Sequence, residues 1–535
     1  MRRPDQAATI PDVLAHQAEL LGDKPYVSLY GEIVTYRALW ERSLRSAAQL
    51  ARVGIQADDK VALLLPTSLE FYDCFYGLMA LGAVPVPLYP ILGVEEMAAL
   101  LADSEAKAVI TVDWFRENVQ KAQARCPTLS RIISPYDFVA SASPPSLRRL
   151  TADDVGLIQY TSGSTGQPKG VVLTHGNLLA NIRAFVDFTL ATSDEVVVSW
   201  LPLYHDMGLV GLGMGTLYAG VTVILLPPDL RDPRPWLEAM EQHRATVTAA
   251  PDFGYRNCVR HLSPSETFDL SSLTMAFTGA EPIRLSTVRS FEERFGLRDI
   301  TRPCYGLAEA TLAVSIMPPG LPLRLDGSGR FISVGRPLPG IEVRIARARE
   351  PGEEGEILVK SPGVMRGYYR NPDATREVLK DGWLHTGDLG FLDAEGYLYV
   401  TGRMKNLIVV AGRNLMPRDF EELVDQFPEV RYSAAVGMDS ERLGTQRLVV
   451  VAEVRDEAMP RGAASHLLRA IVARIHEHQG LRPGQVLLAK KGAIPKTTSG
   501  KIQHARLGEL LASPDFAAQI VYPRRDSSGP PTGPG

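Results

Sequence analysis

Short apolar runs alternate with amphipathic helical patterns over most of the chain, and this alternation constrains the fold more than any other feature. Segments 10–22 and 35–54 have apolar residues spaced three and four apart, which indicates helices. Between and after them, the runs KVALLLP, VPVPLYP and AKAVITV are short and apolar throughout, as is typical of strands buried on both faces. The alternation continues as far as LTMAFTGAEPI at 273–283. Strands that alternate with helices form βαβ units, so the sequence predicts an α/β fold built on covered, mostly parallel sheets.

The pattern of predicted strands and helices changes twice beyond that region. After about Phe331, strand-rich pieces such as EVRIARA and GEILVKSPGV are joined by glycine and acidic turns, which predicts a β-rich subdomain. After GRMKN a further set of strand and helix patterns predicts a small α+β domain. We therefore expect a large domain over residues 1–402, a small C-terminal domain over 403–522 and a disordered tail over 523–535, because the tail lacks apolar residues.

Composition excludes several classes of protein. The 535 residues are 45% hydrophobic and 22% charged, which is typical of a globular protein with an ample core. A net charge of −4 gives no basic surface for nucleic acid, so any phosphate site must be local. The four cysteines lack the CxxC spacing of a zinc site. No apolar stretch is long enough to span a bilayer without being cut by proline, and no signal peptide is evident, so we expect a cytoplasmic protein that is not integral to a membrane.

The sequence YTSGSTGQPKG, at residues 160–170, offers backbone N–H groups, hydroxyls and one ammonium, which are all phosphate ligands. A solvated Gly/Ser linker would have a similar composition. A Walker A loop requires a lysine directly after its second glycine and a hydroxyl after that lysine. Here Gln167 and Pro168 separate Gly166 from Lys169, so the chain is not expected to be a P-loop NTPase.

Four further motifs follow this loop in order. They are CYGLAEAT from Cys304, WLHTGDLG from Trp383, GRMKNLIVVAGRN from Gly402 and IPKTTSGKIQ from Ile494. The complete set resembles the acyl-adenylating superfamily, which includes acyl-CoA synthetases, fatty acyl-AMP ligases, luciferases and nonribosomal-peptide adenylation domains. The resemblance covers nearly the whole chain. It implies that ATP activates a carboxylic acid as acyl-AMP with release of pyrophosphate, and that a pantetheine thiol then accepts the acyl group.

The resemblance also implies a nucleotide site built from distant segments. The glycine-rich loop would fold over the β- and γ-phosphates, TGAEP would border the adenine, and Tyr305 would stack on it. Asp388 and Arg403 would hold the ribose. Ala308 replaces a threonine that is usual in relatives, which removes a hydroxyl near the α-phosphate. The implied nucleotide-binding residues are Thr161, Ser162, Gly163, Ser164, Thr165, Gly166, Lys169, Gly279, Ala280, Glu281, Tyr305, Gly306, Leu307, Ala308, Asp388 and Arg403.

The catalytic groups follow from the same resemblance. Lys501 matches the catalytic lysine of the family, and Glu309 matches the carboxylate that helps to hold Mg²⁺. A lysine and a cation near the attacking carboxylate and the α-phosphate would reduce charge repulsion during adenylation. Lys496, five residues earlier, is the alternative catalytic lysine, and both could instead be solvated surface lysines.

Lys405 occupies the hinge position about which, in this family, the small domain rotates between adenylation and thiol transfer. Two positions depart from the usual residues of the family. Asn406 replaces the aspartate that commonly follows the hinge, and His504 stands where relatives often have arginine. The hinge energetics are therefore expected to differ from those of relatives.

The nature of the acid is suggested by residues 200–220, WLPLYHDMGLVGLGMGTLYAG. Most of this segment is expected to be a core helix, but His205 stands where the family places a residue near the acyl group, so we predict that it contacts the substrate. No Asp or Arg is evident there to pair with an amino group or a second carboxylate, which favours a fatty or other apolar acid. The alternatives are an aryl-acid ligase and, from another class, a catalytically silent nucleotide-binding protein. His476 and His478 are two residues apart and diverge on a helix, so a zinc site there is not expected.

The motifs YHDMGL, AEATL and GRNLMPRDFEE are most similar to those of fatty acyl-AMP ligases that supply carrier proteins of polyketide and lipopeptide assembly. Those ligases carry an insertion after AEATL that is thought to prevent the use of CoA. Residues 313–337 leave little room for it. The acceptor is therefore expected to be a pantetheine thiol, with CoA and an acyl carrier protein both open.

Overall fold

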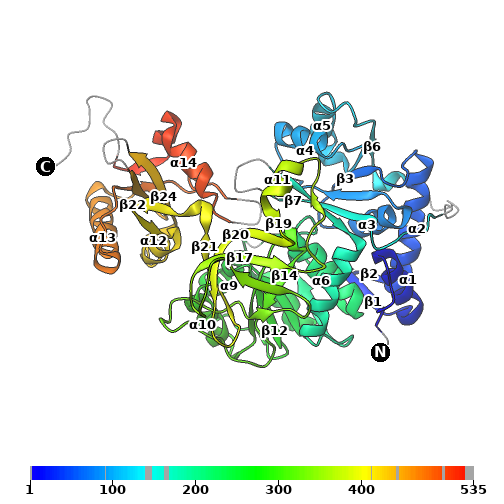
Figure 1. Ribbon diagram of the computed structural model, residues 1–535, viewed down its shortest axis with the longest axis horizontal. Coiled ribbons are helices and arrows are strands. Elements are labelled where there is room, and N and C mark those ends of the chain that lie inside the picture. Colours follow the sequence, from blue (N-terminus) through cyan, green and yellow to red (C-terminus); the bar gives the residue numbers. More distant parts are fainter. Residues whose placement is uncertain are drawn as a thin grey trace. The chain divides into compact units, whose positions relative to one another are not determined.

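The computed structural model describes residues 3–90, 92–138, 147–161, 168–229, 231–410, 412–440, 445–496 and 501–523, coloured along the sequence in Figure 1. The chain divides into two compact units. The large unit contains residues 1–161, 168–386 and 390–400, and the small unit contains 162–167, 387–389 and 401–535. Two expectations, for the loop residues Ser162–Gly166 and for the tail beyond 523, fall outside the described residues.

The main sheet of the large unit has nine strands within the described residues, in the order β15-β14-β13-β12-β11-β9-β10-β1-β2. Its centre, from β1 to β13, is parallel, and antiparallel strands β2, β14 and β15 lie toward its edges. Valine, alanine and threonine predominate in the central strands, whose side chains are largely buried. The bounds are β1 Pro25–Leu29, β2 Glu32–Thr35, β9 Val196–Ser199, β10 Thr222–Leu225, β11 Val247–Ala250, β12 Met275–Thr278, β13 Thr301–Gly306, β14 Ala313–Ile316 and β15 Arg336–Pro337.

A second parallel sheet of the large unit has the order β4-β3-β5-β6. The runs KVALLLP, VPVPLYP and AKAVITV form its first three strands. The bounds are β3 Lys60–Leu64, β4 Val84–Pro87, β5 Ala108–Thr111 and β6 Arg131–Ile133. The predicted helices are α1, Ile10–Leu21, and α2, Tyr36–Arg52. They begin at threonine caps, Thr9 and Thr35, whose hydroxyls accept backbone N–H groups. The predicted α/β class, with covered and mostly parallel sheets, is confirmed.

The glycine-rich loop connects two strands of a third, smaller sheet, β18-β8-β7. Strand β7, Val155–Thr161, is antiparallel to β8, Lys169–Thr174, and their last register pair joins Thr161 to Lys169. The two ends of the loop are therefore held together. A loop closed in this way joins neighbouring strands and is not a linker between domains.

The β-rich region expected after Phe331 forms a five-stranded sheet in the described chain, β16-β17-β20-β19 with β21 paired to β20. The expected helix over residues 200–220 begins only at Met207, and it starts with a wide π-helical stretch to Met214 before α7, Gly215–Ala219. A Cβ at Gly208 would lie 2.3 Å from the carbonyl oxygen of Pro202, so the chain crosses itself closely there. The sheet bounds are β16 Glu342–Ile345, β17 Gly355–Lys360, β19 Leu379–Lys380, β20 Trp383–Leu392 and β21 Leu398–Arg403.

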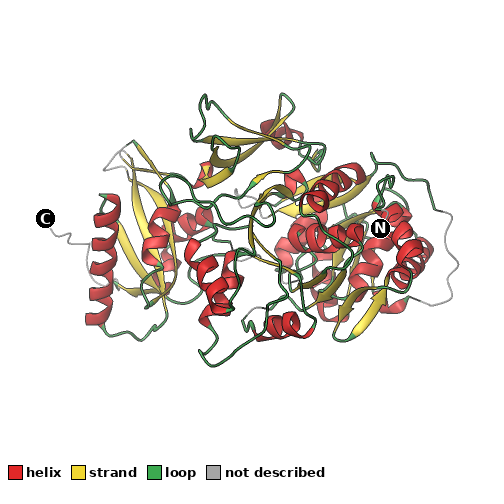
Figure 2. Cartoon of the chain, turned by 90° about the horizontal axis from the view of Figure 1, so that it is seen from below, coloured by secondary structure: helices red, strands yellow, loops and turns green. Residues whose placement is uncertain are grey.

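The small unit has a four-stranded sheet, β24-β25-β26-β27, with helices on both faces (Figure 2). Alternate residues of β25 serve the two faces, since Val450 packs with α12 and α13, whereas Val451 packs with α14. This arrangement is the small α+β fold expected from the sequence. Its bounds are β24 Val430–Ser440, β25 Thr445–Val454, β26 Gln485–Ala489, β27 Ile520–Tyr522, α12 Pro417–Val424, α13 Arg461–Gln479 and α14 His504–Ala512.

No helix among the described residues has the length and apolar character that a membrane crossing requires. His476 and His478 lie exposed in the last turn of α13, and no group of three or more metal-ligating side chains occurs in the part of the chain that the structure describes.

Candidate active site

Two of the predicted nucleotide segments leave neighbouring parallel strands at the same edge of the main sheet. Strands β12 and β13 are paired, with Thr278 opposite Pro303. Gly279 follows the end of β12, and a Cβ at this position would lie 2.7 Å from Sγ of Cys304, so the two segments touch. The carboxyl edge of a parallel sheet is the usual location of ligand sites in α/β proteins. The fold therefore brings TGAEP and CYGLAEA together.

The chain turns sharply after β13. A Cβ at Gly306 would lie 1.7 Å from the carbonyl oxygen of Leu312, so only glycine fits there. A single 3₁₀ turn, Ala308–Ala310, follows, with Ala308 buried and Leu307 half-buried. Ala280 and Thr311 have φ angles of 66° and 72°, which non-glycine residues adopt at an energetic cost. Such backbone strain is concentrated at functional sites.

Glu309, in the turn Ala308–Ala310, lies next to Tyr368 of strand β18, Gly367–Tyr368. The Tyr368 hydroxyl donates a hydrogen bond of 2.8 Å to Oε1 of Glu309. The ammonium of Lys169 lies 4.8 Å from the centroid of the Tyr368 ring, within range of a cation–π interaction. The structure thus connects the predicted phosphate-binding lysine and the predicted metal-binding carboxylate through one tyrosine.

The donor set around Glu309 fits Mg²⁺. Within the described chain, hydrogen bonds engage only Oε1 of this carboxylate, and Oε2 is available to a hard cation. Mg²⁺ is commonly held by one or two carboxylates together with substrate phosphates and water. A single carboxylate near the predicted phosphate-binding lysine therefore fits the usual ligand set of Mg²⁺.

Glu281 has an unusual electrostatic environment. Its Oε1 accepts a 2.6 Å hydrogen bond from the backbone N–H of Phe253. Burial, and in second place the negative charge of Asp252, raise the pKa of Glu281 to about 7. Asp252 is itself fully buried and is held by Arg284 and Thr287. Near neutral pH, Glu281 is therefore divided between its charged and neutral forms.

His205 lies in an aromatic environment. Its ring centroid is 5.5 Å from that of Tyr89 and 6.1 Å from that of Tyr204. Nε2 of His205 is buried and has no hydrogen-bond partner among the described residues. Gln159 of β7 contacts the residue before His205, since its side-chain amide donates to the carbonyl oxygen of Tyr204. The described contacts do not join His205 directly to Glu309 or Lys169.

The predicted ribose residues meet in the small unit. Nε of Arg403 lies 2.6 Å from Oδ1 of Asp388. The Asp388 side chain is 5% exposed, whereas that of Arg403 is 48% exposed. The arginine thus contacts a buried carboxylate, while about half of its own side chain remains exposed. A carboxylate fixed in this way is suited to accept hydrogen bonds from sugar hydroxyls.

The two candidate lysines have different surroundings in the small unit. The ammonium of Lys496 lies 2.9 Å from the ring centroid of Tyr432, and its backbone pairs with Ile502. Lys501 is half-buried and directly precedes the segment that leads into α14. Lys496 is therefore part of the packing of the unit, which favours Lys501 as the functional lysine.

The two departures from the family pattern near the hinge contact each other. Nδ2 of Asn406 lies 3.4 Å from Nδ1 of His504, and Nε2 of His504 lies 2.7 Å from Oε1 of Glu421. Lys405 is exposed in the 3₁₀ turn Met404–Asn406. Asn406, which follows Lys405, therefore contacts the first residue of α14.

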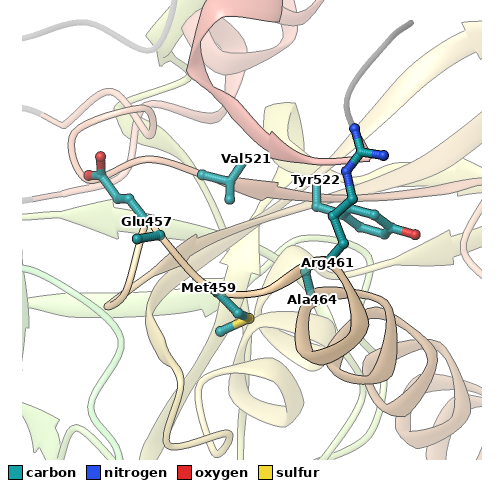
Figure 3. A pocket seen from close by; sticks show the side chains of 7 residues that line it. Glu457, Met459, Arg461, Ala464, Val521 and Tyr522 are labelled. Atoms are coloured by element: carbon teal, nitrogen blue, oxygen red, sulfur yellow. The ribbon is translucent and has the colours of Figure 1, made fainter.

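A cavity of about 150 Å³ also lies in the small unit (Figure 3). None of the residues predicted from the motifs contributes to it. Its polar side chains belong to Glu457, Arg461 and Tyr522, of which the first two are exposed. The full lining is Glu457, Ala458, Met459, Arg461, Ala464, Val521 and Tyr522. We therefore do not assign it to the active site.

Sequence reasoning did not identify Tyr368, Glu421 or the Asn406–His504 contact. Tyr368 belongs to a two-residue strand, which is too short for a periodic pattern. Its partner strand lies early in the chain. The tyrosine pair in GYYRN gave no indication of which ring faces the site.

Comparison with known proteins identifies the family. Residues 14–369 match the AMP-binding enzymes. The chain is 31% identical to a medium-chain-fatty-acid–[acyl-carrier-protein] ligase of Moorena producens, over 88% of each chain. It is 35% identical to a feruloyl-CoA synthase of an Amycolatopsis species, over 79% of this chain and 84% of the relative.

Among solved structures, the chain is similar to one from a study of fatty acyl-adenylate ligases of E. coli and L. pneumophila. The TM-score is 0.87 and the sequence identity 31%, over 97% of this chain and 100% of that structure. The resemblance inferred from the motifs is thereby confirmed. The chain belongs to the AMP-binding enzyme family and is an AMP-forming acid–thiol ligase, which uses ATP, Mg²⁺ and a pantetheine thiol.

Proposed function

We propose that this ligase activates a fatty acid as its acyl-AMP and passes the acyl group to a pantetheine thiol. The observation that carries the proposal is the placement of Lys169 and Glu309 on the two sides of Tyr368. A fixed ammonium and a fixed carboxylate in this position are suited to a triphosphate and its divalent cation. The nucleotide-binding pseudoenzyme is not retained, because the family is one of ligases.

The residue roles are proposed as follows. Lys169 and Thr161, with the loop between them, bind the β- and γ-phosphates, and Glu309 holds Mg²⁺, which supplies charge neutralisation when bound. Tyr305 stacks on the adenine, and Asp388 with Arg403 binds the ribose. Further contacts to the nucleotide are proposed for Gly279, Ala280, Glu281, Gly306, Leu307 and Ala308.

Lys501 is proposed as the catalytic lysine. In the first step a carboxylate oxygen of the acid attacks the α-phosphorus of ATP, and the bond to pyrophosphate breaks. The Lys501 ammonium offsets the negative charge on the reacting oxygens. In the second step a thiolate attacks the acyl carbonyl and AMP leaves. Lys405 is proposed as the hinge that lets the small unit change position between the steps.

The relatives and the surroundings of His205 support an apolar acid. Two tyrosine rings lie close to this histidine, and the apolar segment from Met207 to Met214 follows it in the chain. Relatives include ligases named for medium-chain and long-chain fatty acids. The second candidate is an aryl acid, because one relative is a feruloyl-CoA synthase.

For the acceptor, both an acyl carrier protein and CoA are consistent with the relatives. The connection between β14 and β15 folds on itself, with Leu325 bridged to Ile332. Ser315 of β14 pairs with Pro337 of β15, which closes the segment. A compact connection here supports access for CoA, and a carrier protein remains the second acceptor to test.

The proposal is tested by acid-dependent exchange between ATP and pyrophosphate over a panel of C6–C18 fatty acids and ferulate. We expect exchange with fatty acids, and a loss of roughly 100-fold or more in Lys501→Ala. The matched control is Lys496→Ala, which removes a lysine of the same segment that packs on Tyr432. It should retain exchange within about threefold.

Absence of exchange with every fatty acid would contradict the proposal, and exchange with ferulate alone would support the aryl candidate. Preformed acyl-AMP is then offered to CoA and, in parallel, to a phosphopantetheine-loaded carrier protein. The thiol that is acylated identifies the acceptor.

A further inference from the structure

One short segment links the β7–β8 hairpin to the turn Ala308–Ala310 through the backbone. Residues 365–369 run alongside β8, where Gly367 pairs with Val172 and Tyr368 with Val171. At one end of the segment, Tyr369 N–H donates to the carbonyl oxygen of Gly170 at 2.7 Å. At the other end, Met365 N–H donates to the carbonyl oxygen of Glu309 at 2.8 Å. The segment therefore fixes the distance between the strand that begins at Lys169 and the turn that carries Glu309.

Tyr368 is held rigidly within this segment. Its side chain is largely buried, and its backbone N–H donates to Oγ1 of Thr375 at 2.9 Å. Thr375 belongs to α11, Pro372–Val378, whose first turn is capped by the side chain of Asn371. A Cβ at the preceding Gly367 would lie 2.9 Å from Cγ2 of Thr375, so strand and helix are in close contact. The tyrosine ring thus has little freedom to move.

The tyrosine also separates opposite charges. In the part of the chain that the structure describes, Lys169 and Glu309 form no ion pair, and each contacts Tyr368. A direct ion pair would occupy the lysine and the carboxylate with each other. The phenol instead binds one carboxylate oxygen as a neutral donor and attracts the ammonium to its ring face. Both charges remain available to a ligand.

We propose that Tyr368 is a positioning residue that keeps Glu309 directed toward Mg²⁺ and Lys169 toward the phosphates. The inference rests on the proposed function, since it takes Glu309 as the metal-binding carboxylate and Lys169 as a phosphate ligand. Tyr368 acts through these two residues and is assigned no contact with the reacting atoms.

The test uses Tyr368→Phe, which keeps the ring and removes the hydroxyl. We expect the Mg²⁺ concentration for half-maximal exchange to rise about tenfold, the effect of losing one hydrogen bond to a charged group. Equilibrium binding of ATP should weaken by a similar factor with Mg²⁺ present and change little in EDTA. Tyr368→Leu removes the ring as well, and should weaken ATP binding in EDTA too, because Lys169 loses its ring contact.

Tyr369→Phe is the matched control. It makes the same change one residue further on, where the hydroxyl donates to Oε2 of Glu105 at 2.7 Å. We expect unchanged Mg²⁺ dependence in this variant, even if its unfolding temperature falls as much as that of Tyr368→Phe. Equal shifts of Mg²⁺ dependence in the two variants would overturn the proposal.

A double-mutant cycle with Glu309→Gln shows whether Tyr368 acts through Glu309. We expect Tyr368→Phe to add little to the Mg²⁺ defect of Glu309→Gln, and fully additive effects would also overturn the proposal. If the unmodified protein lacks acid-dependent exchange, the proposed function fails, while the ATP-binding measurements with and without Mg²⁺ still decide the role of Tyr368.

Discussion

Two single side chains show how burial alters protonation in this protein. Burial raises the pKa of Glu281 to about 7, and it lowers the pKa of His175 to about 4. In both cases burial favours the neutral form, so an acid and a base shift in opposite directions. Glu281 follows β12, and His175 begins helix α6, His175–Phe188. The two shifts therefore affect the stability of different parts of the large unit.

For Glu281 we expect a stability that falls as pH rises. Its pKa is higher in the folded than in the unfolded state, so its contribution is present below about pH 4.5 and is lost as pH rises toward 7. Glu281→Gln can still accept from Phe253 and does not titrate. Compared with the unmodified protein, it should have an unfolding temperature higher by roughly 2 °C at pH 8 and no higher at pH 5. A constant difference between the two proteins across this range would contradict the assignment.

At the scale of elements, the turn after β13 depends on one glycine. The chain after Gly306 passes so close to Leu312 that a methyl group has no space. The antiparallel pairing of β13 with β14 ends at this contact, with Gly306 opposite Ala313 and a register shift between Tyr305 and Gly306. The turn therefore sets the position of the Ala308–Ala310 segment relative to the sheet.

Gly306→Ala is expected to displace this turn. The clash with backbone should lower the unfolding temperature by several degrees and the exchange rate by about tenfold or more. Gly327→Ala is the control, because a Cβ at that exposed position would meet nothing within 4 Å. Thermal unfolding and exchange are measured on both, and equal behaviour would show that the close contact at Gly306 is unimportant.

Much of the fold can be predicted from local sequence patterns. The remaining parts are determined by contacts between residues that are distant in the sequence. Buried runs such as KVALLLP predict their strands, and Thr9 with Gly22 marks the ends of α1. The motifs indicate Lys169 and Glu309, but no local signal shows that Tyr368 stands between them. The delayed start of the helix at Met207 has a similar cause, because Gly208 packs against Pro202 in a close crossing. The sequence alone does not specify such approaches.

At the scale of the whole chain, a buried histidine connects helices that are far apart in the sequence. His175 lies buried at the start of α6, where its Nδ1 is 3.4 Å from the backbone nitrogen of Ile10 in α1. A Cβ at Gly156 would lie 2.9 Å from the same ring nitrogen. The imidazole is therefore enclosed by α1 and β7 in addition to its own helix, and it is neutral.

This burial predicts a loss of stability in mild acid. The pKa of His175 is lower in the folded than in the unfolded state, so its contribution is complete above about pH 6.5 and is lost as pH falls toward 4. The unfolding temperature of the unmodified protein should fall more steeply between pH 6.5 and 4.5 than that of His175→Gln. His478→Gln, at an exposed position, is the control and should keep the steep dependence. Parallel curves for all three proteins would contradict the prediction.

The pairing of β18 with β8 has a consequence for biosynthesis. The partners Gly367 and Val172 are separated by roughly 200 residues, so β18, the third strand of this sheet, joins long after β7 and β8 have been synthesised. A nascent chain can close the hairpin of β7 and β8, but Lys169 meets its tyrosine only when residue 368 has left the ribosome. The contact between Lys169 and Tyr368 can therefore form only late in the folding of the large unit, after nearly all of that unit has been translated.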